Sequence, residues 1–98
     1  MNIFSRRISP EQTRHALSEA IHAGGLLLNG NDGNLSDSAF YTWYEYARNC
    51  IQRAFGKDYH NVEANFLYLN IIFLSNNVAA CEKLKHCLKF LTDLIEAV

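Results

Sequence analysis

The stretch Phe40–Phe55, FYTWYEYARNCIQRAF, decides the fold of this chain. Its apolar side chains recur at spacings of three and four residues, which is the period of one face of an α-helix. Ser36 or Asp37 precedes the stretch as a candidate N-cap, and Gly56 follows it where a left-handed residue ends many helices. The pattern predicts a helix over 37–55 whose apolar face consists of Phe40, Trp43, Tyr44, Ala47, Cys50, Ile51, Ala54 and Phe55.

A second amphipathic helix is predicted before it, over about residues 10–28. Ser9 and Gln12 form a capping box around Pro10, which needs no amide partner at the first helical position. Gly24-Gly25 either ends this helix early or lets another helix approach closely. The asparagines and glycines of 29–34 then indicate a surface loop. The apolar stripe consists of Ala16, Leu17, Ala20, Ile21, Gly24, Leu27 and Leu28.

Two further helices are predicted after Gly56, over 62–74 and 78–97, with Asn61 as the cap of the first. In Phe66–Leu74, FLYLNIIFL, only Asn70 interrupts apolar or aromatic residues. A helix that is apolar nearly all round is either central to a bundle or covered by another chain. The last helix carries an apolar seam at spacings of three and four, made of Cys81, Leu84, Leu88, Leu91, Ile95 and Val98.

These four helices predict an all-α chain with a single domain over 1–98, a four-helix bundle built from two helical hairpins. The 98 residues are 49% hydrophobic, which suits one core. The formal net charge of -1 argues against nucleic acid as a partner. No apolar run approaches a membrane span, and none of signal-peptide length follows Arg6 and Arg7. We therefore expect a cytoplasmic protein with no membrane partner.

Catalytic and metal-binding patterns are sparse in the sequence. Three cysteines at Cys50, Cys81 and Cys87 lack the spacing of a disulfide framework, which predicts reduced thiols. His15, Glu19 and His22 share one helix face and could offer three metal ligands, but a solvated face explains the same residues and no second set of ligands is evident. No phosphate-binding loop or catalytic triad can be placed. We expect no cofactor and no metal.

One alternative gives the chain a catalytic role. Arg53 and His60 have an Arg-x6-His spacing, which resembles the catalytic pair of the small helical ribonucleases of the HEPN group. Those enzymes usually have a polar residue directly after the arginine, where this chain has Ala54. The resemblance implies a ribonuclease or a nucleotide-binding helical domain that uses Arg53 and His60. A helix end followed by a turn explains the same residues without catalysis.

The main functional prediction is protein association without catalysis. The predicted helix over 37–55 carries Tyr41, Tyr46 and Arg48 on its polar face, and tyrosine and arginine are enriched at interfaces. Tyr68 and Ile72 belong to the apolar stretch of the third helix. We predict that these five residues form a contact surface for a second copy of the chain, most simply in a dimer, or for a larger protein.

Two family resemblances also imply a helical binding scaffold. Between His15 and Phe66, the order of core residues and the helix stop is similar to helical modules of bacterial anti-phage, abortive-infection proteins, through Ala20-Ile21, Ala23-Gly24, Leu27-Leu28, Phe40, Trp43, Ala47, Ile51 and Phe55-Gly56 with Asp58. This resemblance implies a role in bacterial defence or stress. A shorter set, Phe55-Gly56-Lys57-Asp58 with Val62, Phe66 and Leu69, resembles one turn and helix of a tetratricopeptide repeat of kinesin-light-chain type. Tyr59-His60 stands there in place of the family's His-Pro pair.

Overall fold

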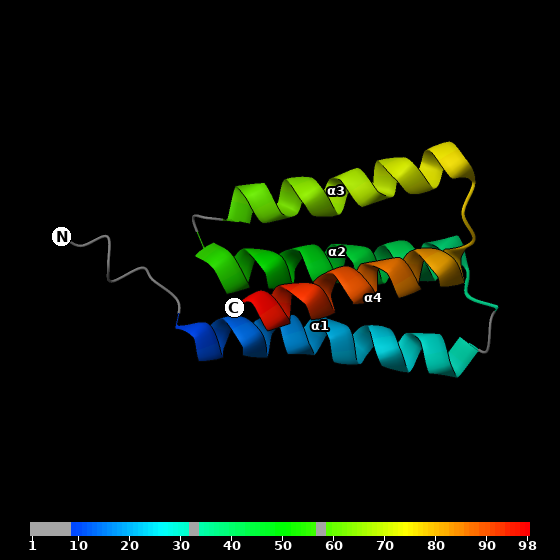
Figure 1. Ribbon diagram of the computed structural model, residues 1–98. Coiled ribbons are helices and arrows are strands. Elements are labelled where there is room, and N and C mark those ends of the chain that lie inside the picture. Colours follow the sequence, from blue (N-terminus) through cyan, green and yellow to red (C-terminus); the bar gives the residue numbers. More distant parts are fainter. Residues whose placement is uncertain (1–8, 32–33, 57–58) are drawn as a thin grey trace.

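The fold is an all-α bundle of helices that run alternately in opposite directions (Figure 1). The computed structural model describes residues 9–31, 34–56 and 59–98. Within these ranges the helices are α1 (Pro10–Asn31), α2 (Asp37–Phe55), α3 (Tyr59–Asn76) and α4 (Ala80–Ala97). The predicted fold class is therefore confirmed. The segment with Arg6 and Arg7 and the predicted loop positions 32–33 and 57–58 lie outside the described residues.

The predicted capping box starts α1. The Gln12 amide donates to Ser9 Oγ at 3.2 Å, and the Ser9 amide donates to Gln12 Oε1 at 3.3 Å. The helix continues through Gly24-Gly25 and ends at Asn31, three residues beyond the predicted Leu28. A Cβ atom at Gly24 would lie 2.7 Å from Leu88 Cδ2 and 3.0 Å from Trp43 Cε2. Of the two alternatives for the glycine pair, close approach of other helices is therefore correct.

The boundaries of α2 agree with the sequence prediction. Ser36 is the N-cap, and its Oγ accepts a hydrogen bond of 3.0 Å from the Ala39 amide. Gly56 follows the helix with a φ of 57°, a backbone conformation that favours glycine, and its amide donates to the Gln52 carbonyl. Because both ends are fixed locally, the orientation of the apolar face of α2 follows from its own sequence.

The boundaries of α3 and α4 differ from those predicted. Asn61 is not a cap but lies inside α3, which begins at Tyr59 and ends at Asn76, two residues beyond Leu74. Asn77 has a φ of 53° and ends the helix, since asparagine tolerates the left-handed region better than most residues. The last helix begins at Ala80 and not at Val78, with Ala79 as an N-cap that has no side-chain hydrogen bond.

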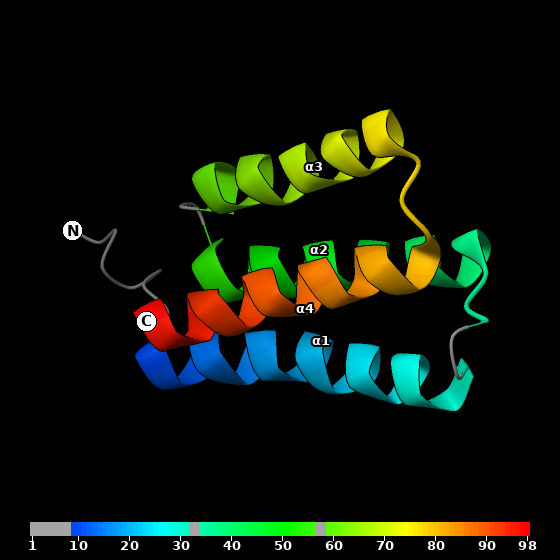
Figure 2. The same cartoon turned by 45° about the vertical axis from the view of Figure 1, so that its right-hand side comes forward.

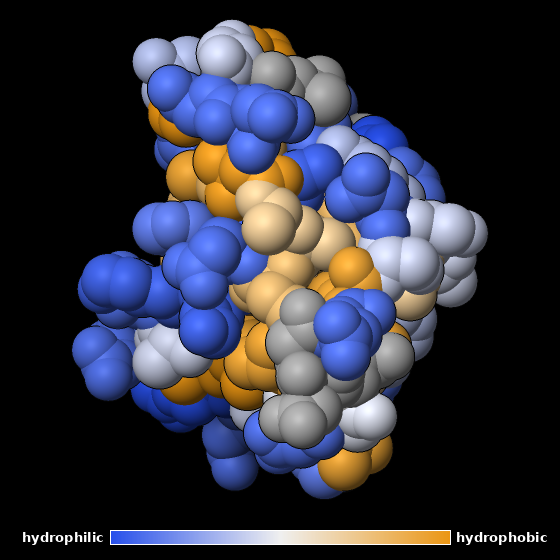
Figure 3. All heavy atoms as spheres, turned by 90° about the vertical axis from the view of Figure 1, so that its right-hand side faces the viewer, coloured by the Kyte–Doolittle hydropathy of each residue, from blue (hydrophilic) through white to orange (hydrophobic). Residues whose placement is uncertain are grey.

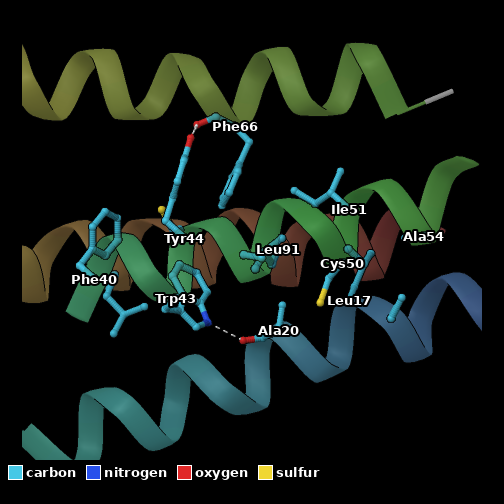
Figure 4. Close-up of a cluster of buried hydrophobic side chains, with 14 of the residues drawn as sticks. Leu17, Ala20, Phe40, Trp43, Tyr44, Cys50, Ile51, Ala54, Phe66 and Leu91 are labelled. Atoms are coloured by element: carbon cyan, nitrogen blue, oxygen red, sulfur yellow. Dashed lines mark hydrogen bonds between the residues drawn. The ribbon is translucent and has the colours of Figure 1, made fainter. Parts of the chain in front are cut away.

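The helices form three layers, with α2 and α4 between α1 and α3 (Figures 1 and 2). The middle helix α2 contributes seven buried residues to the core, whereas the described side chains of α3 contribute two, Phe66 and Phe73. Trp43 Nε1 donates to the Ala20 carbonyl at 2.9 Å (Figure 4), and Thr13 Oγ1 donates to the Ala54 carbonyl at 2.8 Å. These buried bonds join α1 to α2. As far as its described side chains show, the outer helix α3 therefore supplies a smaller share of the core than the middle helix α2.

Candidate functional site

Exposed apolar side chains gather on α3. Six large hydrophobic side chains are exposed among the described residues, and four of them are Leu67, Tyr68, Ile71 and Ile72, at 37%, 61%, 57% and 36%. Their spacing places them on one side of the helix. Ala64 and Ser75, both small and exposed, extend this side toward the two helix ends. These six residues are called the outer face of α3.

Aromatic packing fixes which side of α3 turns inward. The Phe66 and Tyr44 rings are stacked with centroids 4.6 Å apart, and the Tyr44 hydroxyl donates to the Phe66 carbonyl at 3.0 Å (Figure 4). Phe90 of α4 lies on Phe66 with centroids 5.5 Å apart. Burial of the Tyr44 phenol raises its pKa well above the ordinary value, so it stays a hydrogen-bond donor. With Phe66 and Phe73 inward, the outer face of α3 must point away from the bundle.

The single polar residue in the apolar stretch of α3, Asn70, joins three helices. The Tyr41 hydroxyl donates to Asn70 Oδ1 at 3.0 Å, and Lys83 Nζ of α4 lies 3.3 Å from the same hydroxyl. Lys83 is buried, and its ammonium group stacks over the Tyr41 ring at 4.9 Å, with Asp37 Oδ1 at 3.7 Å. Tyr41, predicted as an interface residue, is therefore engaged in contacts within the chain.

A second polar contact holds α3 near its N-terminal end. Arg48 Nη2 and Nε donate to Glu63 Oε2 at 2.8 and 3.2 Å, and Arg48 Nη1 also pairs with Glu45 at 3.2 Å. The hydrogen bond to Glu63 raises the pKa of the Arg48 guanidinium. Arg48, also predicted for the interface, therefore binds α3 to α2. Its charge is matched inside the chain.

The remaining predicted residue of α2, Tyr46, lies on the side that faces α1. Its hydroxyl donates to Glu19 Oε1 at 3.4 Å, and Arg53 Nη2 pairs with the same oxygen at 3.0 Å. Hydrogen bonding to Arg53 lowers the pKa of the Glu19 carboxyl. His15 Nε2 is 3.0 Å from the other Glu19 oxygen. These contacts place Tyr46 in a polar cluster between α1 and α2 and not beside the outer face of α3.

The alternative catalytic pair is divided between two elements. Arg53 is bonded to Glu19 on α1 and lies 3.2 Å from Cys50 Sγ, whereas His60 is an exposed residue in the first turn of α3. Arg53 also lines an open hollow of about 550 Å³ together with Glu11, Gln12, His15 and Ala16. The two residues of the pair thus come from α2 and α3, and the Arg53 guanidinium is paired with the Glu19 carboxylate of α1.

The metal-ligand candidates and the cysteines can be compared with the structure over the described part of the chain. No three His, Cys, Asp or Glu side chains of the residues described come close enough to hold a metal ion. Cys50 and Cys87 are buried free thiols, and Cys81 is partly buried. Burial raises the pKa of the Cys87 thiol to about 12, so it is not the reactive thiolate at neutral pH.

The five predicted interface residues thus separate into two groups. Tyr68 and Ile72 lie on the outer face of α3, while Tyr41, Tyr46 and Arg48 make contacts within the bundle. Leu67 and Ile71 lie on the same face and are not among the five residues predicted from the sequence. Their helical spacing from Tyr68 and Ile72 is the signal that would have included them. Seen from the end where α3 finishes and α4 begins, apolar surface shows between polar side chains (Figure 3).

None of the helices in the described ranges has the length and apolar character needed to cross a membrane. Comparison of the chain with models of protein families, with curated proteins and with solved structures gave no match.

Proposed function

We propose that this chain is a non-catalytic helical module that works by protein association, and that the outer face of α3 is its contact surface. The observation that carries the proposal is the exposure of Leu67, Tyr68, Ile71 and Ile72 side by side on one helix. Contiguous exposed apolar side chains of this kind mark interaction surfaces. The hydrophobic effect would drive their burial against another protein.

The cost of leaving this face in water supports the proposal. Full burial of one leucine, isoleucine or aromatic side chain stabilises by about 1.5 to 3 kcal/mol, so the exposed fractions here forgo about 1 kcal/mol each. Whole domains are stable by only about 5 to 15 kcal/mol. A partner that covers four such side chains therefore gains an amount comparable to a substantial part of that stability.

Two kinds of partner remain for this surface, a second copy of the chain and a larger protein. Both agree with the helical binding scaffold that the defence-module and tetratricopeptide resemblances imply. A bacterial defence or stress system is the setting that we propose from the first of these resemblances.

The experiment that tests the proposal places photo-reactive p-benzoylphenylalanine at position 68 and expresses the full chain in its native cells. Irradiation is expected to give a discrete cross-linked adduct, because the side chain at 68 then lies against the partner. The adduct's mass reports whether the partner is a second copy or another protein.

The matched control places the same amino acid at position 26. Leu26 on α1 is as exposed as Tyr68, at 61%, but lies outside the outer face of α3. Adducts that form equally from positions 26 and 68, or no discrete adduct from position 68, would contradict the proposal.

A further inference from the structure

We infer that the outer face of α3 pairs with the same face of a second copy of this chain, with the two α3 helices antiparallel about a two-fold axis. The inference rests on the proposed function, and it adds the identity of the partner and the geometry of the pair. In Figures 1 and 2, α3 forms one edge of the bundle, with α2 and α4 on its inner side. A second α3 can therefore approach from outside without displacing another helix.

The charge pattern of α3 suits self-pairing. Among Asp, Glu, Lys and Arg, its sequence YHNVEANFLYLNIIFLSN contains only Glu63. Arg48 holds the Glu63 carboxylate at 2.8 Å, and the side chain of Glu63 is largely buried, at 13% exposure. Two copies that meet through the outer face of α3 therefore bring no unmatched like charges together. Most other surfaces of a bundle cannot meet themselves in this way, since like charges directly opposite each other repel.

The residue order on the outer face of α3 is symmetric about the midpoint between Leu69 and Asn70. An antiparallel pair centred there places Ala64 opposite Ser75, Leu67 opposite Ile72, and Tyr68 opposite Ile71. A two-fold interface requires this reciprocity, in which residue i meets residue j and residue j meets residue i. Small residues then meet at both ends and large apolar ones in the middle. The large central side chains then set the distance between the two helix axes, and the small residues at both ends do not obstruct the approach.

Helix electrostatics favours the antiparallel direction over the parallel one. In an antiparallel pair the partial positive charge at each N-terminus lies beside the partial negative charge at the partner's C-terminus. A parallel pair would instead place like helix ends side by side.

The available area sets the strength expected of the pair. The four large exposed side chains supply about 400 Å² on each chain, which is about half of the ~800 Å² that each partner buries in a standard interface. Ala64, Ser75 and the neighbouring exposed Asn61 and Asn65 add to this area. An interface of this size is of the weak, concentration-dependent class, so we expect dissociation in the micromolar range.

Cysteine pairing in the purified full chain tests both the partner and the direction. The exposed small residues are replaced in two separate variants, Ala64→Cys and Ser75→Cys. Cys81→Ala is included in both variants, because Cys81 is only partly buried while Cys50 and Cys87 are buried. The variants are treated with a short bismaleimide, alone and mixed, and one carries an extension so that mixed products differ in mass.

The antiparallel pair predicts a cross-linked product in the mixture that joins position 64 of one chain to position 75 of the other. Each variant by itself should give at least tenfold less product, since the two copies of position 64 would lie far apart. Efficient cross-linking of Ala64→Cys with itself would overturn the antiparallel geometry. A wild-type chain that stays monomeric at about 500 μM would overturn pairing with a second copy, whereas the adduct from position 68 in cells tests association itself.

Discussion

Gly24 and Gly25 are neighbours in α1 with different surroundings. An added Cβ at Gly24 would meet Leu88 and the Trp43 indole at 3.0 Å or less, whereas one at Gly25 would have no heavy atom within 4 Å apart from the adjoining part of α1 itself. At Gly24, the missing side chain therefore lets α2 and α4 approach. At Gly25, glycine makes no contact that alanine would disturb.

Alanine substitution at these two positions is expected to have opposite effects. Gly24→Ala should destabilise the fold by about 1 to 3 kcal/mol, because overpacking forces Leu88 and Trp43 to move. Gly25→Ala should stabilise it by about 0.4 to 1 kcal/mol, because alanine lowers the entropy of the unfolded chain. Urea unfolding of both variants measures the two changes. Equal effects at both positions would show that Gly24 is not the point of close packing.

Glu19 gives the stability of the fold a predicted dependence on pH. Its folded-state pKa is lowered, chiefly by the hydrogen bond to Arg53, so its contribution is present above the unfolded pKa of about 4.3 and is lost as pH falls through the folded value. We expect Glu19→Gln to be less stable than wild type at pH 7. The difference should shrink as the pH falls through the folded-state pKa of Glu19. Chemical unfolding at pH 7 and at a series of lower pH values measures it.

The control for Glu19 is Glu96→Gln, which removes an exposed carboxylate at the other end of the sequence. Its stability difference from wild type should not follow the pattern of Glu19→Gln. If Glu19→Gln is as stable as wild type at pH 7, the Glu19–Arg53 pair does not stabilise the fold.

At the scale of the element, α3 differs from the other helices in how it is attached. Among the side chains of α3 that the structure describes, Phe66 and Phe73 lie fully within the core, and Val62 and Leu69 pack partly against it. Polar contacts from Tyr41 to Asn70 and from Arg48 to Glu63 complete the attachment. Elements with few buried contacts open locally at lower free energy than the core.

Amide hydrogen exchange is expected to show this difference. In protein at about 1 μM, the amides of α3 should exchange faster than those in the middle of α2. As the concentration rises, protection of α3 should increase, because pairing through its outer face restrains the helix. Exchange of α1 should change little. An α3 that is as protected as α2 at low concentration, with no dependence on concentration, would contradict both points.

The sequence predicts α2 well and α3 only in part, for a physical reason. In α2, apolar residues alternate with polar ones at the helical period, and Ser36 and Gly56 mark both ends. In α3, apolar residues occur on nearly every side of the helix, so their spacing does not indicate which side is buried. Tyr44 and Phe90 decide this by packing on Phe66, and such contacts between distant residues leave no periodic signal.

Contacts between distant residues also limit what the sequence can predict about the interface. Tyr41 and Arg48 have the composition of an interface, but their partners Asn70 and Glu63 belong to another helix of the same chain. A polar side chain that binds within the bundle cannot be told from one that binds a partner until the helices are placed. The apolar excess that points to Tyr68 and Ile72 belongs to one helix, so it is visible in the sequence itself.

For the whole molecule, the excess of apolar surface on α3 leads to a prediction about assembly. The apolar stripes of α1, α2 and α4 turn toward the core, while the outer face of α3 is left at the edge. Pairing of two copies through α3 would place the two bundles on opposite sides of a shared, charge-free seam.

The absolute mass in solution, measured by light scattering from about 5 to 500 μM under reducing conditions, tests this pairing. Wild type should rise from 11.2 kDa toward twice that mass, while Tyr68→Asp should stay at 11.2 kDa with unchanged helicity. Leu26→Asp, which alters an equally exposed residue of α1, should behave as wild type. A wild-type mass of 11.2 kDa at every concentration, or a rise that Tyr68→Asp leaves intact, would contradict self-association through the outer face of α3.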